Sequence, residues 1–354
     1  MPDWTRSMKQ TFEYSIVDPA TWRDKERIDN IESCAITRDL ESDTLGSASL
    51  TSFDDYSDKY IRCRLVTEQD GRIEKTVLGT HLYQSPSTSY RARRQSSSQD
   101  GYTSLIELTE KMPSYGYSLA KSTDIMGMAA SIIEEQARAP VVRADSSDQL
   151  FDIFVSNTDD TWLTFLTDLI GNANYDFALD PMGQILFAKR QNINGLNPVW
   201  TYNDDNSSIL YPDISIARDL YGVPNVVEVI YSSPERITPL IATAENTDPA
   251  SPVSIPNRGR RVVVRETSPN IVEGAKKEQI EEYAKNRLKE LSSLEYTITY
   301  KHGYCPVQLG DCVMLNYKLG NLSGVKAKVI RQVISCESGC SVEETAVYSK
   351  QLWG

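Results

Sequence analysis

Apolar and polar residues alternate with a period of two over much of the first hundred residues, which predicts β-strands. In YIRCRLV (60–66), Ile61, Cys63 and Leu65 occupy one face, whereas Arg62 and Arg64 occupy the other. One face of this strand should therefore be buried. Asp70-Gly71 is a favoured two-residue hairpin turn and leads into a second strand near residues 73–82. Further short strands are predicted at 36–40, 47–53 and 104–110. This spacing is typical of a small antiparallel barrel or sandwich.

A polar insert, QSPSTSYRARRQSSSQDG (84–101), interrupts this pattern and is predicted to be a loop. Its arginines Arg91, Arg93 and Arg94 could contact phosphate. In a serine-rich segment of an acidic chain, however, such a run is typical of a solvated or interface loop.

The hydrophobic period changes to that of an α-helix from about residue 114. One helix is predicted between the cap candidates 122–124 and Ala139. A second helix should follow the cap candidates 158–160 and end at Gly171, which we expect to adopt a left-handed capping conformation. Each helix has one apolar face, which should pack on a neighbouring element.

A turn signal between two short strands follows these helices. Asp180-Pro181-Met182-Gly183 places proline and glycine at the favoured positions of a type I turn. Two helices followed by two strands predict a compact α+β module at residues 114–192.

The remainder of the chain returns to strands and contains one clear helix. The segment 234–259, rich in proline and asparagine, is predicted to be a long loop that is functional or mobile. A helix at about 275–292 has one apolar stripe and should pack on the sheet formed by the last three strands. The predicted strands are 225–233, 260–266, 296–300, 312–317 and 325–335.

Length and charge bound the architecture and the partners. At 354 residues the chain is long enough for two or three domains. Acidic residues number 49 and basic residues 37, which argues against a surface built to hold nucleic acid. No run of about 18 apolar residues is present and the first residues lack the apolar core of a secretion signal, so we expect no membrane segment and synthesis in the cytoplasm.

Six cysteines raise the question of a metal site, because four of them fall late in the chain. These four, Cys305, Cys312, Cys336 and Cys340, lie near His302 and offer the ligand types that hold zinc or an iron-sulfur cluster. Their spacings match neither the common zinc knuckle nor ferredoxin runs. Free cysteines are also common as small buried hydrophobes, so we favour that role and predict no metal and no cofactor.

The sequence contains no convincing constellation of catalytic residues. Only two histidines exist, His81 and His302, and neither has a recognisable partner nearby in sequence. No phosphate-binding glycine motif is present. In VQLGDCVMLNY (307–317), Gly310 permits a bend and Asp311 can hydrogen-bond the turn backbone, so we interpret this corner as a strand entry. We predict that the protein is not an enzyme.

Three stretches carry a resemblance to a known family: the strand-rich N-terminal region, DTWLTFLTDLIGNANYDFALDPMGQILFAKR (160–190) and AKNRLKELSSLEYTITYKHGYCPVQLGDCVMLNY (284–317). In order and pattern they resemble the baseplate or tail-tip hub proteins of long-tailed bacteriophages, relatives of the spike-base proteins of type VI secretion systems. In those hubs a helix, a strand and a Gly-Asp corner open the last barrel. The corresponding corner here is VQLGDCVML.

The resemblance implies a mainly β fold with an α+β part: two tube-type antiparallel β-barrels, near 1–113 and 193–354, flank the module at 114–192. It also implies a homotrimer whose six barrels form a pseudo-sixfold ring. Such a ring would join the distal tail tube protein and the tape-measure protein to the central spike or tail fibre proteins, with DNA present only in transit. The protein would be assembled in the host cytoplasm and reside in the virion tail.

Under this resemblance the loops 84–101 and 234–259 become candidates for the subunit interface or the lumen. An acidic lumen would repel the DNA backbone, so that the genome slides through without sticking. The arginines in or beside the two loops are the candidate residues: Arg91, Arg93, Arg94, Arg258 and Arg260.

The alternative is an envelope-polysaccharide-binding or cell-wall-degrading tail enzyme. It would need convergent carboxylates or an exposed aromatic platform, for which Trp22, Trp200 and Trp353 are the candidates. Aromatic residues also serve cores and interfaces, and we favour that role for all three. The sequence ends at Gly354, soon after the predicted second barrel, so we expect no fused cell-wall-degrading region.

Overall fold

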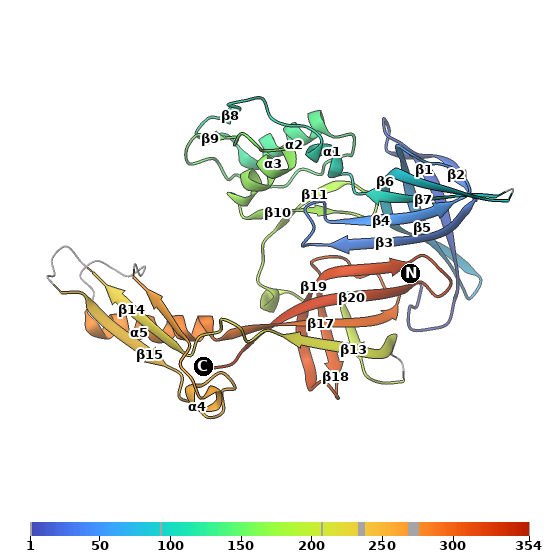
Figure 1. Cartoon of the computed structure of the whole chain (residues 1–354). Helices are drawn as coiled ribbons and strands as arrows, with labels where there is room; N and C mark the ends of the chain where they lie inside the picture. The colour runs from blue at the N-terminus through green and yellow to red at the C-terminus, as the bar shows by residue number, and fades with distance from the viewer. Residues whose placement is uncertain (1, 93, 207, 233–237, 268–275, 354) are drawn as a thin grey trace. The chain divides into compact units, whose positions relative to one another are not determined.

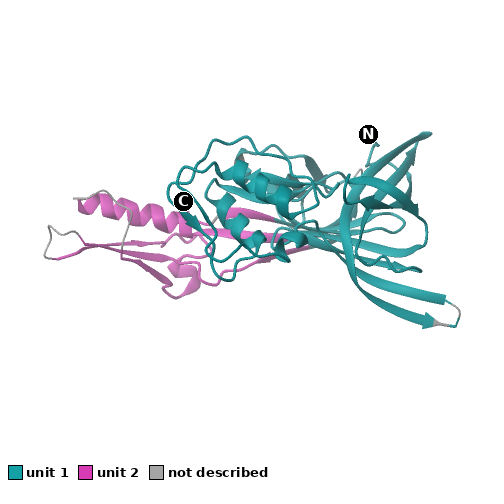
Figure 2. Ribbon diagram, turned by 90° about the horizontal axis from the view of Figure 1, so that it is seen from above, with its two compact units in different colours: residues 1–214, 300–346 teal, residues 215–299, 347–354 magenta. Residues whose placement is uncertain are grey.

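The structure is a computed structural model that describes residues 2–92, 94–206, 208–232, 238–267 and 276–353. The chain forms two compact units, coloured separately in Figure 2. Unit 1 comprises residues 1–214 and 300–346, and unit 2 comprises residues 215–299 and 347–354. The predicted division into three domains at residues 113 and 192 stays a prediction.

Strands make up most of the regular structure (Figure 1), which confirms the predicted mainly β class. The strands are β1 (Lys9–Asp18), β2 (Arg23–Ile28), β3 (Ile31–Asp39), β4 (Gly46–Ser52), β5 (Lys59–Gln69), β6 (Arg72–Arg91), β7 (Arg94–Tyr102), β8 (Ser118–Leu119), β9 (Phe154–Val155), β10 (Tyr175–Leu179), β11 (Ile185–Lys189), β12 (Trp200–Asn203), β13 (Leu210–Arg218), β14 (Val226–Tyr231), β15 (Leu240–Glu245), β16 (Val263–Glu266), β17 (Ser293–Gly303), β18 (Cys312–Tyr317), β19 (Leu322–Ser335) and β20 (Ser341–Gln351). The helices are α1 (Ile106–Thr109), α2 (Ile125–Gln136), α3 (Trp162–Gly171), α4 (Ile255–Arg258) and α5 (Lys277–Leu291), with a 3-10 turn at Ile193–Gly195.

One 13-stranded sheet connects the two ends of the sequence. Its order is β13-β17-β20-β19-β3-β4-β7-β6-β5-β1-β2, and β18, with β12 beside it, branches from β19. Antiparallel pairing of β19 with β3 joins the C-terminal strands to the N-terminal ones. The paired residues run from Arg331 opposite Asp39 to Ser335 opposite Ala35. Among the described strands this path is open at β13 and at β2, so hydrogen bonding does not close either end into a separate barrel.

The alternating pattern at 60–66 forms β5, and the predicted hairpin into β6 turns at Asp70 and Gly71. Both residues have positive φ, 50° and 74°, as a two-residue hairpin turn requires. One expectation is wrong: Arg62 lies on the face expected to be solvated, yet it is only 1% exposed. The α+β module covers this face, because one of its turns hydrogen-bonds to Arg62.

The insert 84–101 is not a loop, which corrects the prediction. β6 and β7 continue through it as a hairpin, from Gln84 opposite Asp100 to Arg91 opposite Arg94. The ladder of a hairpin is made by backbone N–H and C=O groups, so a serine-rich composition does not prevent it.

The segment 104–110 is also wrongly predicted, because it contains the helix α1 and not a strand. Leu105 and Leu108 are both fully buried and lie three residues apart, which is helical spacing. A short apolar run fits either period. Packing on the neighbouring core decides between them.

The helices α2 and α3 form where the pattern predicts them and share a core with Tyr60 and Leu82 of the N-terminal strands. Thr161 caps α3, since its hydroxyl accepts the N–H of Thr164 at 3.2 Å. Gly171 does not take the expected left-handed conformation and is instead the last helical residue. The positive φ belongs to Asn174, at 61°, where the chain turns into β10.

The Asp180–Gly183 turn joins β10 to β11 as predicted, and it anchors the α+β module on the N-terminal strands. Gly183 has φ 79°, a conformation that glycine adopts without strain. Side chains of the N-terminal region hold three consecutive carbonyl oxygens of this turn. The bonds are Trp22 Nε1 to Met182 O (2.8 Å), Arg62 Nη2 to Met182 O (3.1 Å), Thr80 Oγ1 to Pro181 O (3.2 Å) and Ser104 Oγ to Gly183 O (2.9 Å).

Unit 2 contains the three-stranded sheet β15-β14-β16, which α5 covers. The helix forms at its predicted place, but its predicted packing partner is wrong. Its fully buried residues Ile280, Ala284 and Leu288 join a core with Val227 and Val229 of β14. The helix therefore packs on β14 and not on the sheet of the predicted strands 296–300, 312–317 and 325–335.

The segment 234–259 is not a continuous loop, because β15 and α4 lie within it. Proline and asparagine suggested a loop, but Pro256 occupies the first turn of α4, where proline is tolerated. Residues 234–237 lie outside the described residues. Among the described residues, no helix combines the length and apolar character needed to cross a bilayer.

Candidate binding cleft and buried clusters

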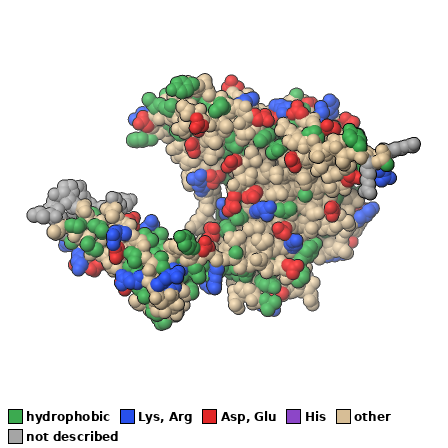
Figure 3. Space-filling view, viewed as in Figure 1, with side chains coloured by type: hydrophobic (Ala, Val, Ile, Leu, Met, Phe, Trp, Pro, Cys, Tyr) green, Lys and Arg blue, Asp and Glu red, His purple; other side chains and the backbone are tan. Residues whose placement is uncertain are grey.

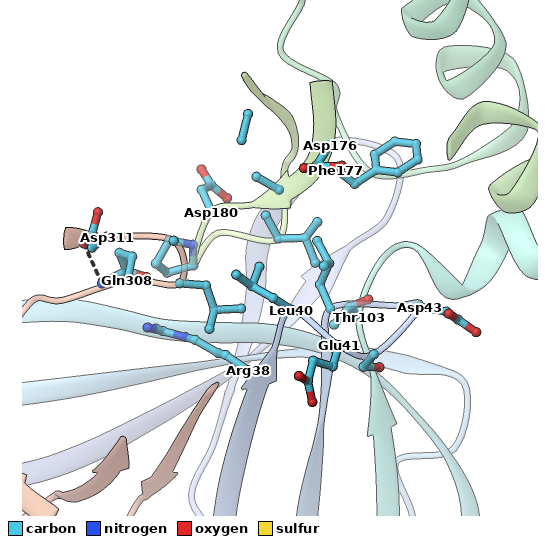
Figure 4. Close-up of a pocket in the computed structure, with 18 of the residues that line it drawn as sticks. Arg38, Leu40, Glu41, Asp43, Thr103, Asp176, Phe177, Asp180, Gln308 and Asp311 are labelled. Atoms are coloured by element: carbon cyan, nitrogen blue, oxygen red, sulfur yellow. Dashed lines mark hydrogen bonds between the residues drawn. The ribbon is translucent and has the colours of Figure 1, made fainter. Parts of the chain in front are cut away.

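A cleft of about 1220 Å³ opens in unit 1 between the end of β3, the α+β module and the corner at 308–311 (Figure 4). Glu41 and Asp43, in the turn after β3, are exposed at its edge. Asp176 and Phe177 of β10 line the opposite wall. The cleft therefore lies where three segments distant in sequence meet.

The corner at 308–311 forms as the sequence predicts. Gly310 has φ 81°, and Asp311 Oδ2 accepts the backbone N–H of Gln308 at 2.8 Å. The Gly310 N–H donates to Val329 O at 2.8 Å, which ties the corner to β19. Burial raises the pKa of Asp311. Asp311 therefore stabilises the turn that leads into β18, in agreement with the interpretation of this corner as a strand entry.

Two acidic residues of the α+β wall, Asp176 and Asp180, are engaged in structural contacts. Asp176 accepts three hydrogen bonds from the Arg190 guanidinium, from Nε to each carboxylate oxygen at 2.9 Å and from Nη2 to Oδ1 at 2.6 Å. Asp180 Oδ1 accepts the Gln184 N–H at 2.8 Å, and burial raises the pKa of this carboxyl group. These carboxylates hold β10, β11 and their turn.

Two basic side chains, those of Arg38 and His81, also line the cleft. Arg38 donates to Gln332 Oε1 at 2.9 Å and to Leu78 O at 2.7 Å, and burial lowers its pKa. Burial also lowers the pKa of His81 to about 4, so His81 is neutral at pH 7. Among the acids that line the cleft, Asp176, Asp180 and Asp311 are thus held by hydrogen bonds, whereas Glu41 and Asp43 are exposed at its edge.

A buried carboxylate cluster lies behind the cleft and consists of Glu344, His302, Tyr202, Tyr300 and Gln332. Glu344 and His302 are fully buried, with 3.6 Å between His302 Nε2 and Glu344 Oε2. Gln332 Nε2 donates to Oε2 at 2.7 Å, and the hydroxyls of Tyr202 and Tyr300 both donate to Oε1. Both oxygens of this carboxylate thus accept hydrogen bonds, which a buried carboxylate needs.

His302 is held in a charged state by this cluster. Burial opposes its protonation, but hydrogen bonds to Cys305 and Glu344 raise its pKa to about 10. Cys305 Sγ lies 3.8 Å from His302 Nδ1, so cysteine, histidine and glutamate follow one another as in a nucleophilic triad. All three side chains are buried away from solvent, so the arrangement stabilises the core and offers no substrate access.

The four late cysteines predicted as potential ligands do not gather. Within the described residues, the one group of three potential ligands that comes together is Cys34, Cys63 and Cys336, whose sulfur atoms all lie within 4.8 Å of one another. Cys305 contacts His302 instead, and Cys312 and Cys340 are buried elsewhere in unit 1. The sequence offered no signal for this group, because Cys34 and Cys63 lie far from Cys336 along the chain. The predicted lack of a cofactor stays a prediction.

The candidate arginines occupy different settings. Arg91 ends β6 and the exposed Arg94 begins β7, whereas Arg93 lies outside the described residues. Arg258 donates from Nη1 and Nη2 to two backbone carbonyls of its own unit, at 2.6 and 2.9 Å, and is therefore a structural residue of unit 2. Arg260 is exposed. An interface or lumen role for these arginines stays a prediction.

The three candidate tryptophans are not freely exposed. Trp22 is 7% exposed and packs edge-on against Tyr60 at 4.9 Å between ring centroids. Trp200 is half-buried at the start of β12, and Trp353 packs on the core of unit 2. These settings fit the core or interface role that we favoured.

An exposed apolar patch on the α+β module was not anticipated from the sequence. Its members are Met112, Tyr115, Phe151, Ile153 and Val155. Tyr115 is 94% exposed and Phe151 87%, and pairing of β8 with β9 brings their two segments together. Figure 3 shows hydrophobic side chains gathered over this part of unit 1. Exposed apolar patches of this kind mark interaction surfaces.

Comparison with known proteins gives a consistent result for the fold. No protein-family model matches the sequence, and no curated protein shows a significant match. Among solved structures, a tail protein from Neisseria meningitidis aligns with 97% of this chain and 98% of its own, at a TM-score of 0.59 and 16% identity. The chain has the fold of a phage tail protein. This confirms the resemblance to tail proteins at the level of the fold.

Two further structures share this tail-protein fold. A prophage tail protein from Shewanella oneidensis has a TM-score of 0.59 and 10% identity, covering 95% of this chain and 98% of its own. An Escherichia coli component of the type VI secretion system, described as similar to the bacteriophage T4 tail proteins gp27 and gp5, has a TM-score of 0.51 and 11% identity. It covers 96% of this chain and 78% of its own. The tail-protein fold thus extends over nearly the whole chain.

Proposed function

We propose that the protein is a structural hub of a bacteriophage tail tip or baseplate. The observation that carries this proposal is the match to two tail proteins over almost the full length of both chains. A match of this extent supports a tail role for the chain as a whole. The hub would act by holding other tail components together and not by turnover.

The assembly would be a ring of three copies. Each copy supplies two strand-rich segments, the N-terminal strands β1 to β7 and the C-terminal strands β12, β13 and β17 to β20. Three chains would then present six similar wall segments, which matches a sixfold tail tube above and a threefold spike below. Tail tube and tape-measure proteins would bind one face, and spike or fibre proteins the other.

Net charge supports passage of DNA through such a ring. The 49 acidic residues against 37 basic ones give the chain an overall negative charge. Phosphates are repelled by a surface of the same sign, so the genome would cross the ring without binding to it.

Contacts between copies would use the apolar patch of the α+β module. Its two most exposed rings, Tyr115 and Phe151, would be removed from water on assembly. Aromatic residues that become buried in this way contribute most of the binding energy in many interfaces.

The test is the position of the protein in purified tail particles. Gold-labelled antibody against the native chain should mark the distal end of the tail, on the axis, and tryptic peptides of the chain should be recovered from those particles. Absence from tails would overturn the proposal. Release of fragments from purified peptidoglycan, lost in a single carboxylate variant, would instead establish the enzyme alternative.

A further inference from the structure

Three buried cysteines from separate parts of unit 1 converge on one point. Cys34 lies on β3, Cys63 on β5 and Cys336 directly after β19. Their exposed fractions are 4%, 3% and 5%, and the sulfur atoms all lie within 4.8 Å of one another. We call them the sulfur cluster. Cys63 Sγ and Cys336 Sγ are 3.7 Å apart.

The backbone holds these sulfurs in place. β3 and β5 are separated by β4, β7 and β6 in the sheet, so in a flat sheet they would lie roughly 19 Å apart at about 4.8 Å per strand. The N-terminal strands must therefore curl until β3 and β5 face each other. Cys336 is fixed beside Cys34, because its N–H donates to Cys34 O at 3.0 Å.

The spacing of the sulfurs suits a shared metal ion. With zinc–sulfur bonds of about 2.3 Å, two sulfurs of a tetrahedral or trigonal shell lie roughly 3.8 to 4.0 Å apart. The observed 3.7 Å pair and the 4.8 Å limit bracket this range. A disulfide would need a sulfur–sulfur distance of about 2.05 Å, and it would leave the third thiol without a role.

We propose that Cys34, Cys63 and Cys336 bind one zinc ion as a structural clasp. Binding replaces three S–H bonds by three S–Zn bonds and releases three protons to solvent. The clasp would connect β3 and β5 of the N-terminal strands to the segment after β19. This site goes beyond the proposed tail function and does not depend on it.

The surroundings favour a divalent ion. Three thiolates and Zn²⁺ leave one net negative charge, whereas three thiolates and Cu⁺ would leave two. The guanidinium of Arg38 lies within electrostatic reach of Cys336 and offsets a single charge. Tyr83 places its hydroxyl 4.0 Å from Cys34 Sγ, where an oxygen donor can complete the shell or hydrogen-bond a thiolate.

Because the sulfurs are buried, the ion would enter as the chain folds. The full chain is therefore refolded under reducing conditions with zinc chloride, desalted, and analysed for metal per chain by plasma mass spectrometry. The expected result is about one zinc per chain, retained against a chelator while the protein is folded. Refolding with cobalt chloride should give thiolate-to-cobalt charge-transfer absorption.

Cysteine variants distinguish zinc bound at the sulfur cluster from zinc bound at other cysteines. Cys34→Ser and Cys63→Ser should each lower bound zinc to less than about a tenth, while Cys312→Ser, which removes an equally buried thiol outside the cluster, should leave it unchanged. The metal content of the wild-type protein does not depend on whether any variant folds. It therefore decides by itself whether the protein binds zinc. Zinc-free protein without a charge-transfer band, iron with labile sulfide, or a Cys63–Cys336 disulfide in the refolded chain would each overturn the proposal.

Discussion

At the scale of single residues, the protein places charged side chains in its core and surrounds each with partners. Glu344 faces two tyrosines, a glutamine and a histidine. Arg62 is 1% exposed and donates to Asp24 Oδ1 at 2.7 Å and to Thr80 Oγ1 at 3.0 Å. Removing one partner from such a group leaves an uncompensated charge, which is costly.

Glu344→Gln should therefore destabilise the protein strongly. His302 would lose one of the two groups that raise its pKa against burial, and the side-chain amide cannot accept hydrogen bonds at both positions. We expect a loss of about 3–5 kcal/mol in the free energy of unfolding by urea. The neighbouring Glu343, in a half-exposed ion pair with Lys301, provides the control, and Glu343→Gln should cost about 0–1 kcal/mol. Equal costs for the two variants would contradict this account of the carboxylate cluster.

His81 should make the protein less stable in acid. Burial lowers its folded pKa to about 4, while its unfolded pKa is about 6.5. The stability that comes from keeping His81 neutral in the folded protein is fully present above about pH 6.5. It is lost as pH falls towards 4, which lowers the free energy of unfolding by up to about 3 kcal/mol. His81→Gln should lose less unfolding free energy than wild type between about pH 7 and pH 4. The same pH dependence in both proteins would show that His81 titrates normally in the fold.

Residue-level burial was only partly predictable from sequence. The corner at Gly310 and Asp311 followed from turn chemistry, because its hydrogen bonds are local. The burial of Arg62 did not, because Met182, which covers it, lies 120 positions away. The sulfur cluster was missed for the same reason, since its members share no local pattern.

At the scale of elements, the Asp180–Gly183 turn joins the α+β module to the N-terminal strands. A Cβ at position 183 would lie 3.0 Å from Thr80 Cβ and 3.2 Å from Trp22 Cζ2. The turn is therefore in close contact with the strands, in addition to its four hydrogen bonds.

Gly183→Ala should cost more stability than Gly71→Ala. Both glycines have positive φ, 79° and 74°, so each substitution carries about 1 kcal/mol of backbone strain. Only the substitution at position 183 adds a steric clash, because the space beside Gly71 is open. The clash should add roughly 1–3 kcal/mol to the loss of stability. The two midpoints of thermal unfolding measure the difference. Matching midpoints would mean that the module does not pack here as described.

Elements with long, regular periods were predicted correctly, as β5, α2, α3 and α5 illustrate. Elements whose form depends on a distant partner were not. The β6–β7 hairpin runs through a serine-rich segment, α1 is four residues long, and β15 forms only by pairing with β14. Composition indicated loops or strands there, but pairing and packing decided otherwise.

At the scale of the whole molecule, the structure unites the two ends of the sequence through β19 and β3. This pairing joins residues almost 300 positions apart, so no local pattern could predict it. The curling of the N-terminal strands, shown by the approach of Cys34 to Cys63, gives this region the curvature of a tube wall. Closure of such a wall would then come from neighbouring copies.

The stoichiometry of the purified assembly tests the central claim most directly. Native mass spectrometry combined with cryo-electron microscopy of the intact protein should give a mass of three chains, each of 39.8 kDa, arranged in a ring around an open axial channel. A stable monomer at the concentrations used for imaging, or an assembly without an axial opening, would contradict the proposal that this chain forms a tail hub.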